Sequence, residues 1–265
     1  MQRFEDKVAI ITGAASGIGR EIARRFATEG ANIAIADLNE QGAEETAEIV
    51  RGLGRRALFA KTDVADGDAV RAAIAAAIDG LGHVDILVND AGINIRERVY
   101  EMTDEQWHKV IDVNLHGVWY FCRHILDHFF TRGGGNIVNI ASIGAFEASH
   151  DRVPYMASKG AVASMTRALA IDLAEKNIRV NTVAPGMTAS NLATPQLKKD
   201  MDAWTKVLTP MRRWAKSEEI AAAVAFLASD DASYVTGHVL TVDGGMTAGN
   251  RIGRVLPAST SPEEW

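Results

Sequence analysis

The feature that most constrains the fold is a repeated alternation of short apolar runs with longer stretches of helical periodicity. Several short runs are continuously apolar and rich in β-branched residues, which is typical of parallel strands covered on both faces. The predicted strands are residues 7–12, 31–37, 56–61, 84–89, 136–141, 178–184 and 238–242. The predicted helices are residues 17–29, 41–52, 69–81, 104–131, 152–176 and 217–229. This alternation predicts an α/β fold with a doubly wound, parallel, seven-stranded sheet and helices on both faces.

The chain is expected to form a single domain over residues 1–265, because 265 residues approach the upper size of one hydrophobic core. Residues 186–215 form an unusually long connection, which predicts a loop that closes over a substrate, with a permanently packed loop as the alternative. Residues 249–265 show little periodicity, and we interpret them as a tail that is disordered or reaches a neighbouring subunit.

Charge and composition argue against several classes of partner. The net charge is −6, and no lysine or arginine tract suggests binding to nucleic acid. The single cysteine, Cys122, excludes an intrachain disulfide, and no carboxylate–histidine cluster suggests a metal. We see neither a signal segment nor an apolar run of about 18 residues. We therefore expect a cytoplasmic protein that contacts no membrane.

A glycine-rich turn connects the first predicted strand to the first predicted helix. It reads Thr-Gly-Ala-Ala-Ser-Gly-Ile-Gly over residues 12–19. Glycine permits a tight turn and lets a helix N-terminus approach a pyrophosphate, although ordinary turns also contain glycine. The residues expected to bind a dinucleotide here are Gly13, Ser16, Gly17, Ile18 and Gly19.

Further candidate cofactor contacts follow the next predicted strands. Asp37 closes the second strand, 18 residues after Gly19, where a carboxylate accepts hydrogen bonds from ribose hydroxyls and repels a 2′-phosphate. This favours NAD over NADP. Asp63 could accept from the adenine amino group or cap a helix, and Asn89 could tie strands together or line the cleft. The remaining candidates after the third and fourth strands are Val64, Ala91 and Gly92.

The strongest chemical signal is Tyr155, followed four residues later by Lys159. On a helix these residues share one face, and the ammonium would then lower the pKa of a phenol that ordinarily titrates at about 10. With Ser142 upstream and Asn114 on another predicted helix, they form a candidate acid–base centre.

These motifs resemble the short-chain dehydrogenase/reductase family, in the group with a Thr-Gly-x-x-x-Gly-x-Gly loop and an Asn-Ser-Tyr-Lys tetrad. The resemblance runs from Lys7 to about Gly245 and implies a Rossmann-like fold. It implies that Tyr155 is the catalytic acid/base and that Ser142 hydrogen-bonds the reacting oxygen. It further implies that Lys159 holds the nicotinamide ribose and lowers the tyrosine pKa, while Asn114 supports a proton relay through water.

The resemblance also extends to Pro185 and Gly186, where the family's backbone meets the nicotinamide. The chain departs from the common pattern at two places. Asp90 stands where many members have asparagine, so an extra carboxylate lies near the cleft. After Gly186 the chain reads Met-Thr-Ala-Ser, which makes Thr188 and Ser190 the candidate hydroxyl contacts to the cofactor.

Two polar segments are expected to flank a small-molecule substrate by the same resemblance. The candidate contacts are Asn94 and Arg96 after Gly92, and His150 between Ser142 and Tyr155. Their polarity favours oxidoreduction of a polyol, sugar or sugar acid with NAD. A 3-oxoacyl-thioester reductase is the alternative enzyme, and a non-catalytic NAD-binding scaffold is the alternative from another class.

The resemblance also implies a homotetramer or a homodimer. The family usually assembles through the two helices predicted over residues 104–131 and 152–176. Apolar candidates for such an interface include Val118, Phe121 and Met165.

Overall fold

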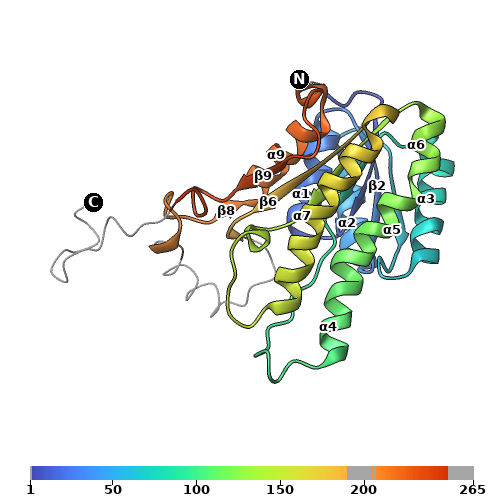
Figure 1. Ribbon diagram of the computed structural model, residues 1–265. Coiled ribbons are helices and arrows are strands. Elements are labelled where there is room, and N and C mark those ends of the chain that lie inside the picture. The colour runs from blue at the N-terminus through green and yellow to red at the C-terminus, as the bar shows by residue number, and fades with distance from the viewer. Residues whose placement is uncertain (1, 190–204, 206, 250–265) are drawn as a thin grey trace.

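The computed structural model describes residues 2–189, 205 and 207–249. Its centre is a parallel sheet of seven strands in the order β3-β2-β1-β4-β5-β6-β9 (Figure 1). The strands are β1 (Val8–Thr12), β2 (Asn32–Asp37), β3 (Ala57–Lys61), β4 (Ile86–Asn89), β5 (Gly135–Ile140), β6 (Ile178–Pro185) and β9 (Val239–Val242). Each predicted strand is confirmed to within two residues at either end. The strand order reverses between β1 and β4, which places a ligand crevice at the carboxyl ends of these strands.

Helices cover both faces of the sheet, as predicted (Figure 1). Contacts place α1 (Gly17–Thr28), α2 (Glu40–Gly52) and α9 (Ser217–Ala228) in one layer. The opposite layer contains α3 (Gly67–Leu81), α5 (Gly117–His124) and α7 (Val153–Leu173). Successive residues of β1 alternate between the layers. Ala9 and Ile11 face the first layer and Val8 and Ile10 the second, which is why a central strand must be apolar throughout.

Polar side chains mark the helix starts on the site side of the sheet. The Asn39 side chain accepts a hydrogen bond from the Gly42 amide at the start of α2. Asp66 accepts from two amides at the start of α3, and Thr103 forms a reciprocal capping box with Gln106 at the start of α4 (Asp104–Ile111). Each cap typically contributes about 1 kcal/mol and fixes where the preceding loop ends.

The prediction of a single helix over residues 104–131 is wrong in one respect. The segment consists of α4, a π-helical turn (Asp112–His116), α5 and α6 (Leu126–Arg132). A π turn inserts an extra residue without ending the helix, so the apolar spacing on either side still looks helical. The insertion matters because Asn114 lies within it.

The predicted long loop has its two ends joined. β7 (Thr188–Ala189) pairs in parallel with β8 (Ala215–Lys216), a small sheet that sequence periodicity did not predict. Most of the expected substrate loop, residues 190–204 and 206, lies outside the described residues. The predicted tail lies outside them too, from residue 250 onward.

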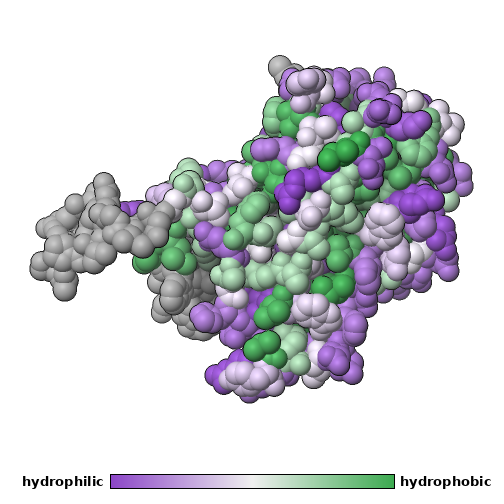
Figure 2. Space-filling view, viewed as in Figure 1, coloured by the Kyte–Doolittle hydropathy of each residue, from purple (hydrophilic) through white to green (hydrophobic). Residues whose placement is uncertain are grey.

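Two of the apolar residues suggested for an intersubunit interface belong to the core instead. Val118 is 4% exposed and Phe121 is fully buried, so neither can face a partner. Met165 is partly buried against the same core. Figure 2 shows apolar residues exposed along the face that carries α5 and α7. Trp119 on α5 and Ile171 on α7 are exposed large apolar side chains.

Cys122 is fully buried beneath the sheet, as expected of a core residue. Burial raises the pKa of its thiol to about 12, so the sulfur is unreactive at neutral pH. Within residues 2–189, 205 and 207–249, no helix is both long and apolar enough to cross a membrane.

Candidate active site

Lys159 occupies the centre of the candidate site. Its side chain is 4% exposed, and its ammonium donates a hydrogen bond to the Ile140 carbonyl at 2.8 Å. The same nitrogen lies 5.8 Å from the centre of the Tyr155 ring. Because Ile140 ends β5 and Ser142 follows two residues later, this bond holds the Tyr155 turn of α7 against the segment that carries Ser142.

Asn114 ties three segments together. Its Oδ1 accepts from the Ile93 amide at 2.8 Å, and its Nδ2 donates to the Ile93 carbonyl at 2.9 Å. Nδ2 also lies 3.2 Å from the hydroxyl of Ser158, which in turn donates to the Tyr155 carbonyl at 2.8 Å. The π-helical turn, the loop after β4 and α7 are therefore held in one arrangement. Sequence reasoning missed Ser158, since a serine inside a helix gives no distinguishing signal.

Gly92 lets the chain pass close to these residues. A Cβ built at Gly92 would lie 3.3 Å from Asn114 Oδ1 and 3.5 Å from Lys159 Nζ. The structure thus brings together Lys159, Tyr155, Asn114 and Gly92, four residues that come from three separate predicted segments.

Ser142 lies at the start of a short 3₁₀ turn (Ile143–Ala145), and its Oγ accepts a hydrogen bond from the Gly144 amide at 3.1 Å. Among the described residues, the hydroxyl proton of Ser142 has no acceptor, so it remains available for a substrate oxygen. Gly144 packs on α7, where an added Cβ would lie 2.6 Å from Met156 Sδ. The turn therefore lies beside the residue that follows Tyr155.

A buried polar network underlies this centre. Asn89 on β4 donates to Asn139 on β5 at 2.9 Å, and Asn139 donates to Thr166 on α7 at 3.0 Å. Thr166 is also hydrogen-bonded to Thr182 on β6 at 2.6 Å. Asn89 is 2% exposed, so its side chain ties strands together. Of the two expectations for Asn89, the structure thus supports the one in which it ties strands together, and a contact between Asn89 and the cofactor stays a prediction.

The glycine turn packs tightly against the segment after β4. Gly13 has φ +69°, and a Cβ there would lie 2.7 Å from Ala91 Cα. At Gly19 a Cβ would lie 2.5 Å from the Gly13 carbonyl oxygen. The Thr12 hydroxyl accepts from the amides of Asp90 and Ala91, both at 3.0 Å. These contacts leave no room for larger side chains in the turn, as a pyrophosphate cradle requires.

The start of α1 offers free hydrogen-bonding groups. Ser16 precedes the helix, is exposed and makes no capping hydrogen bond. Gly17 opens the helix with φ +58°. The Ile18 side chain packs against the core of the α1 layer, so Ile18 would meet a cofactor through its backbone. An uncapped helix N-terminus of this kind fits a phosphate group.

Asp37 connects the end of β2 to the glycine turn. Its Oδ2 accepts from the Ala15 amide at 2.8 Å and its Oδ1 from the Asn39 amide at 2.9 Å. Arg20 donates to the Ala15 carbonyl and pairs with Glu45 at 2.9 Å, while Lys61, opposite Asp37 in the sheet, pairs with Glu40 at 2.7 Å. Both cations near Asp37 thus already form ion pairs with carboxylates of α2.

The remaining predicted cofactor contacts lie along the same end of the sheet. Asp63 is exposed and accepts from the Ala65 amide at 3.0 Å, while Asp66 caps α3. Val64 is 7% exposed and packs against Gly117 of α5. Its side chain therefore belongs to the core.

The end of β6 brings Gly186 close to the end of β9. A Cβ at Gly186 would lie 2.7 Å from Asp243 Cα, directly after the buried Pro185. The Thr188 hydroxyl donates to the Gly186 carbonyl at 3.2 Å. Ser190, the other predicted hydroxyl contact, lies outside the described residues.

Asp90 places a carboxyl group between the glycine turn and Lys159. Burial raises the pKa of this carboxyl to about 7, while the charge of Lys159 and a hydrogen bond from the Gly19 backbone oppose the rise. A Cβ at Gly19 would lie 2.8 Å from Asp90 Oδ2. The carboxyl therefore titrates close to neutral pH beside the glycine turn.

The three predicted substrate contacts are all exposed side chains in loops at this end of the sheet: Asn94, Arg96 and His150. A backbone hydrogen bond from Glu97 to Asp151, at 3.0 Å, holds the two loops together. The loops therefore flank Tyr155 jointly, although nothing in the sequence pattern predicted their direct contact.

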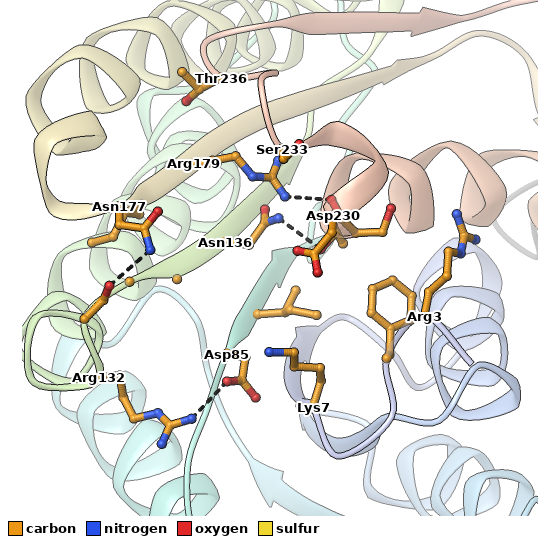
Figure 3. A pocket seen from close by; sticks show the side chains of 18 of the residues that line it. Arg3, Lys7, Asp85, Arg132, Asn136, Asn177, Arg179, Asp230, Ser233 and Thr236 are labelled. Atoms are coloured by element: carbon orange, nitrogen blue, oxygen red, sulfur yellow. Dashed lines mark hydrogen bonds and ion pairs between the residues drawn. The ribbon is translucent and has the colours of Figure 1, made fainter. Parts of the chain in front are cut away.

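A separate pocket lies at the opposite, amino end of the strands, and its polar side chains bind the protein itself (Figure 3). Arg179 donates to the carbonyls of Leu227 and Ser229 at 2.8 and 2.9 Å. Asn136 donates to the Leu227 carbonyl at 3.1 Å, and Arg132 pairs with Asp85 at 3.2 Å. The side chains of this pocket fasten the end of α9 to the sheet. The pocket is remote from Tyr155.

Comparison with known proteins agrees with this geometry. The sequence model described as Enoyl-(Acyl carrier protein) reductase matches residues 13–247. The cis-4-hydroxycyclohexanecarboxylate dehydrogenase of Sinomonas cyclohexanicum is 42% identical over 93% of this chain and 99% of that protein. Glucose 1-dehydrogenase 2 of Bacillus subtilis is 39% identical over 91% of this chain and 95% of that protein.

Among solved structures, carveol dehydrogenase from Mycobacterium avium, in complex with NAD, superposes with a TM-score of 0.90. It is 32% identical, and the match covers 94% of this chain and all of that one. The chain belongs to the short-chain dehydrogenase/reductase family, and its fold is the Rossmann-like fold of that family. It is accordingly an oxidoreductase.

Proposed function

We propose that the protein is an NAD-dependent dehydrogenase that interconverts a polar secondary alcohol and the corresponding ketone. The observation that carries this proposal is the position of Lys159, whose buried ammonium lies beside the Tyr155 ring and is fixed to the end of β5. An ammonium beside a phenol, at the end of a parallel sheet, favours proton transfer at the phenol oxygen.

The proposed roles follow from the groups that each residue presents. As a phenolate, Tyr155 accepts the proton of the substrate hydroxyl during oxidation, and as a phenol it donates that proton to the carbonyl oxygen during reduction. The Ser142 hydroxyl, whose proton has no acceptor among the residues that the structure describes, donates to the substrate oxygen and stabilises its developing charge. Lys159 presents its charge to the phenol and the nicotinamide ribose, and Asn114 fixes the π-helical turn beside it. When bound, NAD supplies the hydride acceptor.

NAD is proposed over NADP because of Asp37. A carboxylate at the end of β2 accepts hydrogen bonds from ribose hydroxyls and repels a 2′-phosphate. The nearby cations, Arg20 and Lys61, are paired with Glu45 and Glu40, and these carboxylates offset the attraction of the cations for a phosphate. The NAD complex of the carveol dehydrogenase supports the same choice.

The polar substrate is supported by the loops and the relatives. Asn94, Arg96 and His150 are exposed on the two loops beside Tyr155. The named relatives act on a hydroxycyclohexanecarboxylate and on glucose, both of which carry several oxygen atoms. A 3-oxoacyl-thioester reductase remains the second candidate, because the 3-oxoacyl-[acyl-carrier-protein] reductase FabG of Thermotoga maritima is 36% identical over 92% of this chain.

A panel of substrates tests the proposal. NADH formation is measured with polyols, sugars and hydroxy acids, and NAD(P)H oxidation with 3-oxoacyl thioesters. Turnover of a secondary alcohol with NAD supports the proposal, and turnover of thioesters alone favours the acyl reductase. Tight NAD binding with no turnover would indicate a scaffold. Asp37→Ser is expected to reduce the preference for NAD over NADP by about tenfold or more, which corresponds to about 1.4 kcal/mol.

We also propose that the chain assembles into a homotetramer or homodimer in the cytoplasm through α5 and α7. Trp119 is 43% and Ile171 79% exposed on these helices, and large apolar side chains are enriched at such interfaces. Sedimentation of the purified protein tests the proposal, and a monomer at micromolar concentration would contradict it.

A further inference from the structure

Two arginines near Tyr155, Arg152 and Arg96, form no ion pair with any residue that the structure describes. Arg152 directly precedes α7, three residues before Tyr155, and Arg96 lies in the loop after β4. The backbone hydrogen bond between Glu97 and Asp151 joins the two loops next to these residues. Two guanidinium groups are therefore held on adjacent loops at the mouth of the candidate site.

Arg152 is half-buried, and its Nε is covered by protein without a hydrogen-bond acceptor. Over the described ranges, neither Arg152 nor Arg96 forms a side-chain hydrogen bond or an ion pair. Burial lowers the pKa of Arg152, the charge of Arg96 lowers it further, and an electrostatic interaction with Tyr155 opposes the change. A half-buried cation beside a second cation costs folding free energy, and no ion pair within residues 2–189, 205 and 207–249 offsets this cost.

Other half-buried arginines of this chain are satisfied. Arg179 donates to the carbonyls of Leu227, Ser229 and Val235. Arg3 pairs with Glu29 at 2.6 Å. Arg152 is thus unlike them, and a buried polar atom without a partner in the described part of the chain is a candidate contact for a ligand.

We propose that Arg152 and Arg96 form a subsite for a carboxylate group of the substrate, so that the substrate class is a hydroxy acid. This inference rests on the proposed function and names the substrate of the same site. The planar, fixed donors of a guanidinium match the two oxygens of a carboxylate. The anion would neutralise the two cations and orient the hydroxyl toward Tyr155.

Binding of an unreactive anion tests the subsite without turnover. Benzoate and benzamide have nearly the same shape, and only benzoate carries a charge. Calorimetry of the NAD-loaded protein should detect benzoate and show benzamide at least tenfold weaker. Arg152→Gln should abolish this difference, and Arg152→Lys should retain part of it. Equal binding of the two compounds by the unaltered protein would overturn the inference.

Steady-state kinetics test the same subsite with substrates. Hydroxy acids are compared with their primary amides, and kcat/KM for the acids should exceed that for the amides by about 10- to 100-fold. Arg152→Gln should lower kcat/KM for the acids, mainly by raising KM. It should leave kcat/KM for the amides almost unchanged, and this retained activity also shows that the variant is folded. Arg96→Gln should act in the same direction more weakly.

Arg98→Gln is the matched control, because Arg98 is an exposed arginine of the same loop that bonds the Tyr100 hydroxyl at 3.1 Å. It should leave the preference for acids unchanged. Failure of every alcohol to react would contradict the proposed dehydrogenase, whereas benzoate binding would still decide the subsite. Turnover of neutral alcohols with no preference for acids would contradict the subsite alone.

Discussion

The ammonium of Lys159 donates a hydrogen bond to the backbone carbonyl of Ile140 at 2.8 Å, and this contact joins α7 to the end of β5 directly beneath Tyr155. The buried lysine therefore has two roles in the proposed site. It fixes the helical turn that carries the phenol, and it places a positive charge 5.8 Å from the centre of the phenol ring.

Replacing Lys159 should lower the activity of the enzyme more than the stability of its fold. Lys159→Met removes the charge and leaves the Ile140 carbonyl without its donor, so kcat/KM is expected to fall by at least about 10- to 100-fold. Lys109→Met is the matched control, since Lys109 is an exposed lysine on α4. A Lys159→Met variant within twofold of the original activity would contradict the assigned role.

The glycine turn should tolerate no side chain at Gly13. Gly13→Ala would force a Cβ to within 2.7 Å of Ala91 Cα at φ +69°. A positive φ alone costs about 1 kcal/mol for alanine, and the contact adds to this cost. Thermal unfolding should show a clear loss of stability together with weaker NAD binding. Gly52→Ala, where a Cβ meets nothing within 4 Å, should be neutral or slightly stabilising.

Asn114 should contribute to stability as well as to activity. Asn114→Ala leaves the backbone amide and carbonyl of Ile93 without their partners, at a cost of about 3 kcal/mol in the free energy of unfolding. Ser158→Ala removes one hydroxyl from the same network and should cost about 1 kcal/mol. Urea unfolding of both variants measures the two values. If Asn114→Ala were as stable as the original protein, Asn114 would not be a structural tie.

Asp90 should make stability depend on pH in the absence of NAD. Its pKa is raised from 3.8 to about 7 in the folded protein, so the folded state holds a proton that the unfolded state has lost. Stability attributable to this group is therefore greatest near pH 4 and is lost as the pH rises toward 7.

Comparing Asp90→Asn with the original protein between pH 5 and about 7 tests this dependence. The variant should lose less unfolding free energy over that range because asparagine does not titrate. Asp172→Asn, which alters an exposed carboxylate on α7, should behave like the original protein. Identical pH profiles for the original and Asp90→Asn would refute the assignment.

The strands and the glycine turn could be predicted from the sequence because their signals are local. A strand such as Val8–Thr12 is buried along its whole length, and its apolar run shows this directly. Gly13 and Gly19 were recognisable because only glycine fits where two backbones meet. Tyr155 and Lys159 could be paired because both lie on one helix.

Other features depend on contacts between distant segments, and the sequence pattern does not encode them. The π-helical turn at Asn114 preserves the apolar spacing, so it looked like continuous helix. Apolar periodicity indicated that Phe121 is buried, but it could not distinguish burial in the core from burial against a partner subunit. The structure places Phe121 in the core. Asn89 faces β5, and this orientation depends on the sheet register.

The account depends most on proton transfer by Tyr155, and Tyr155→Phe tests it directly. The variant keeps the ring and its packing but lacks the phenol oxygen. With the alcohol found to be turned over, kcat should fall by about 10²–10⁴-fold. NAD affinity, measured separately by calorimetry, should remain within a few-fold of the original value. A Tyr155→Phe protein that oxidises the alcohol at an unchanged rate would contradict the proposed mechanism.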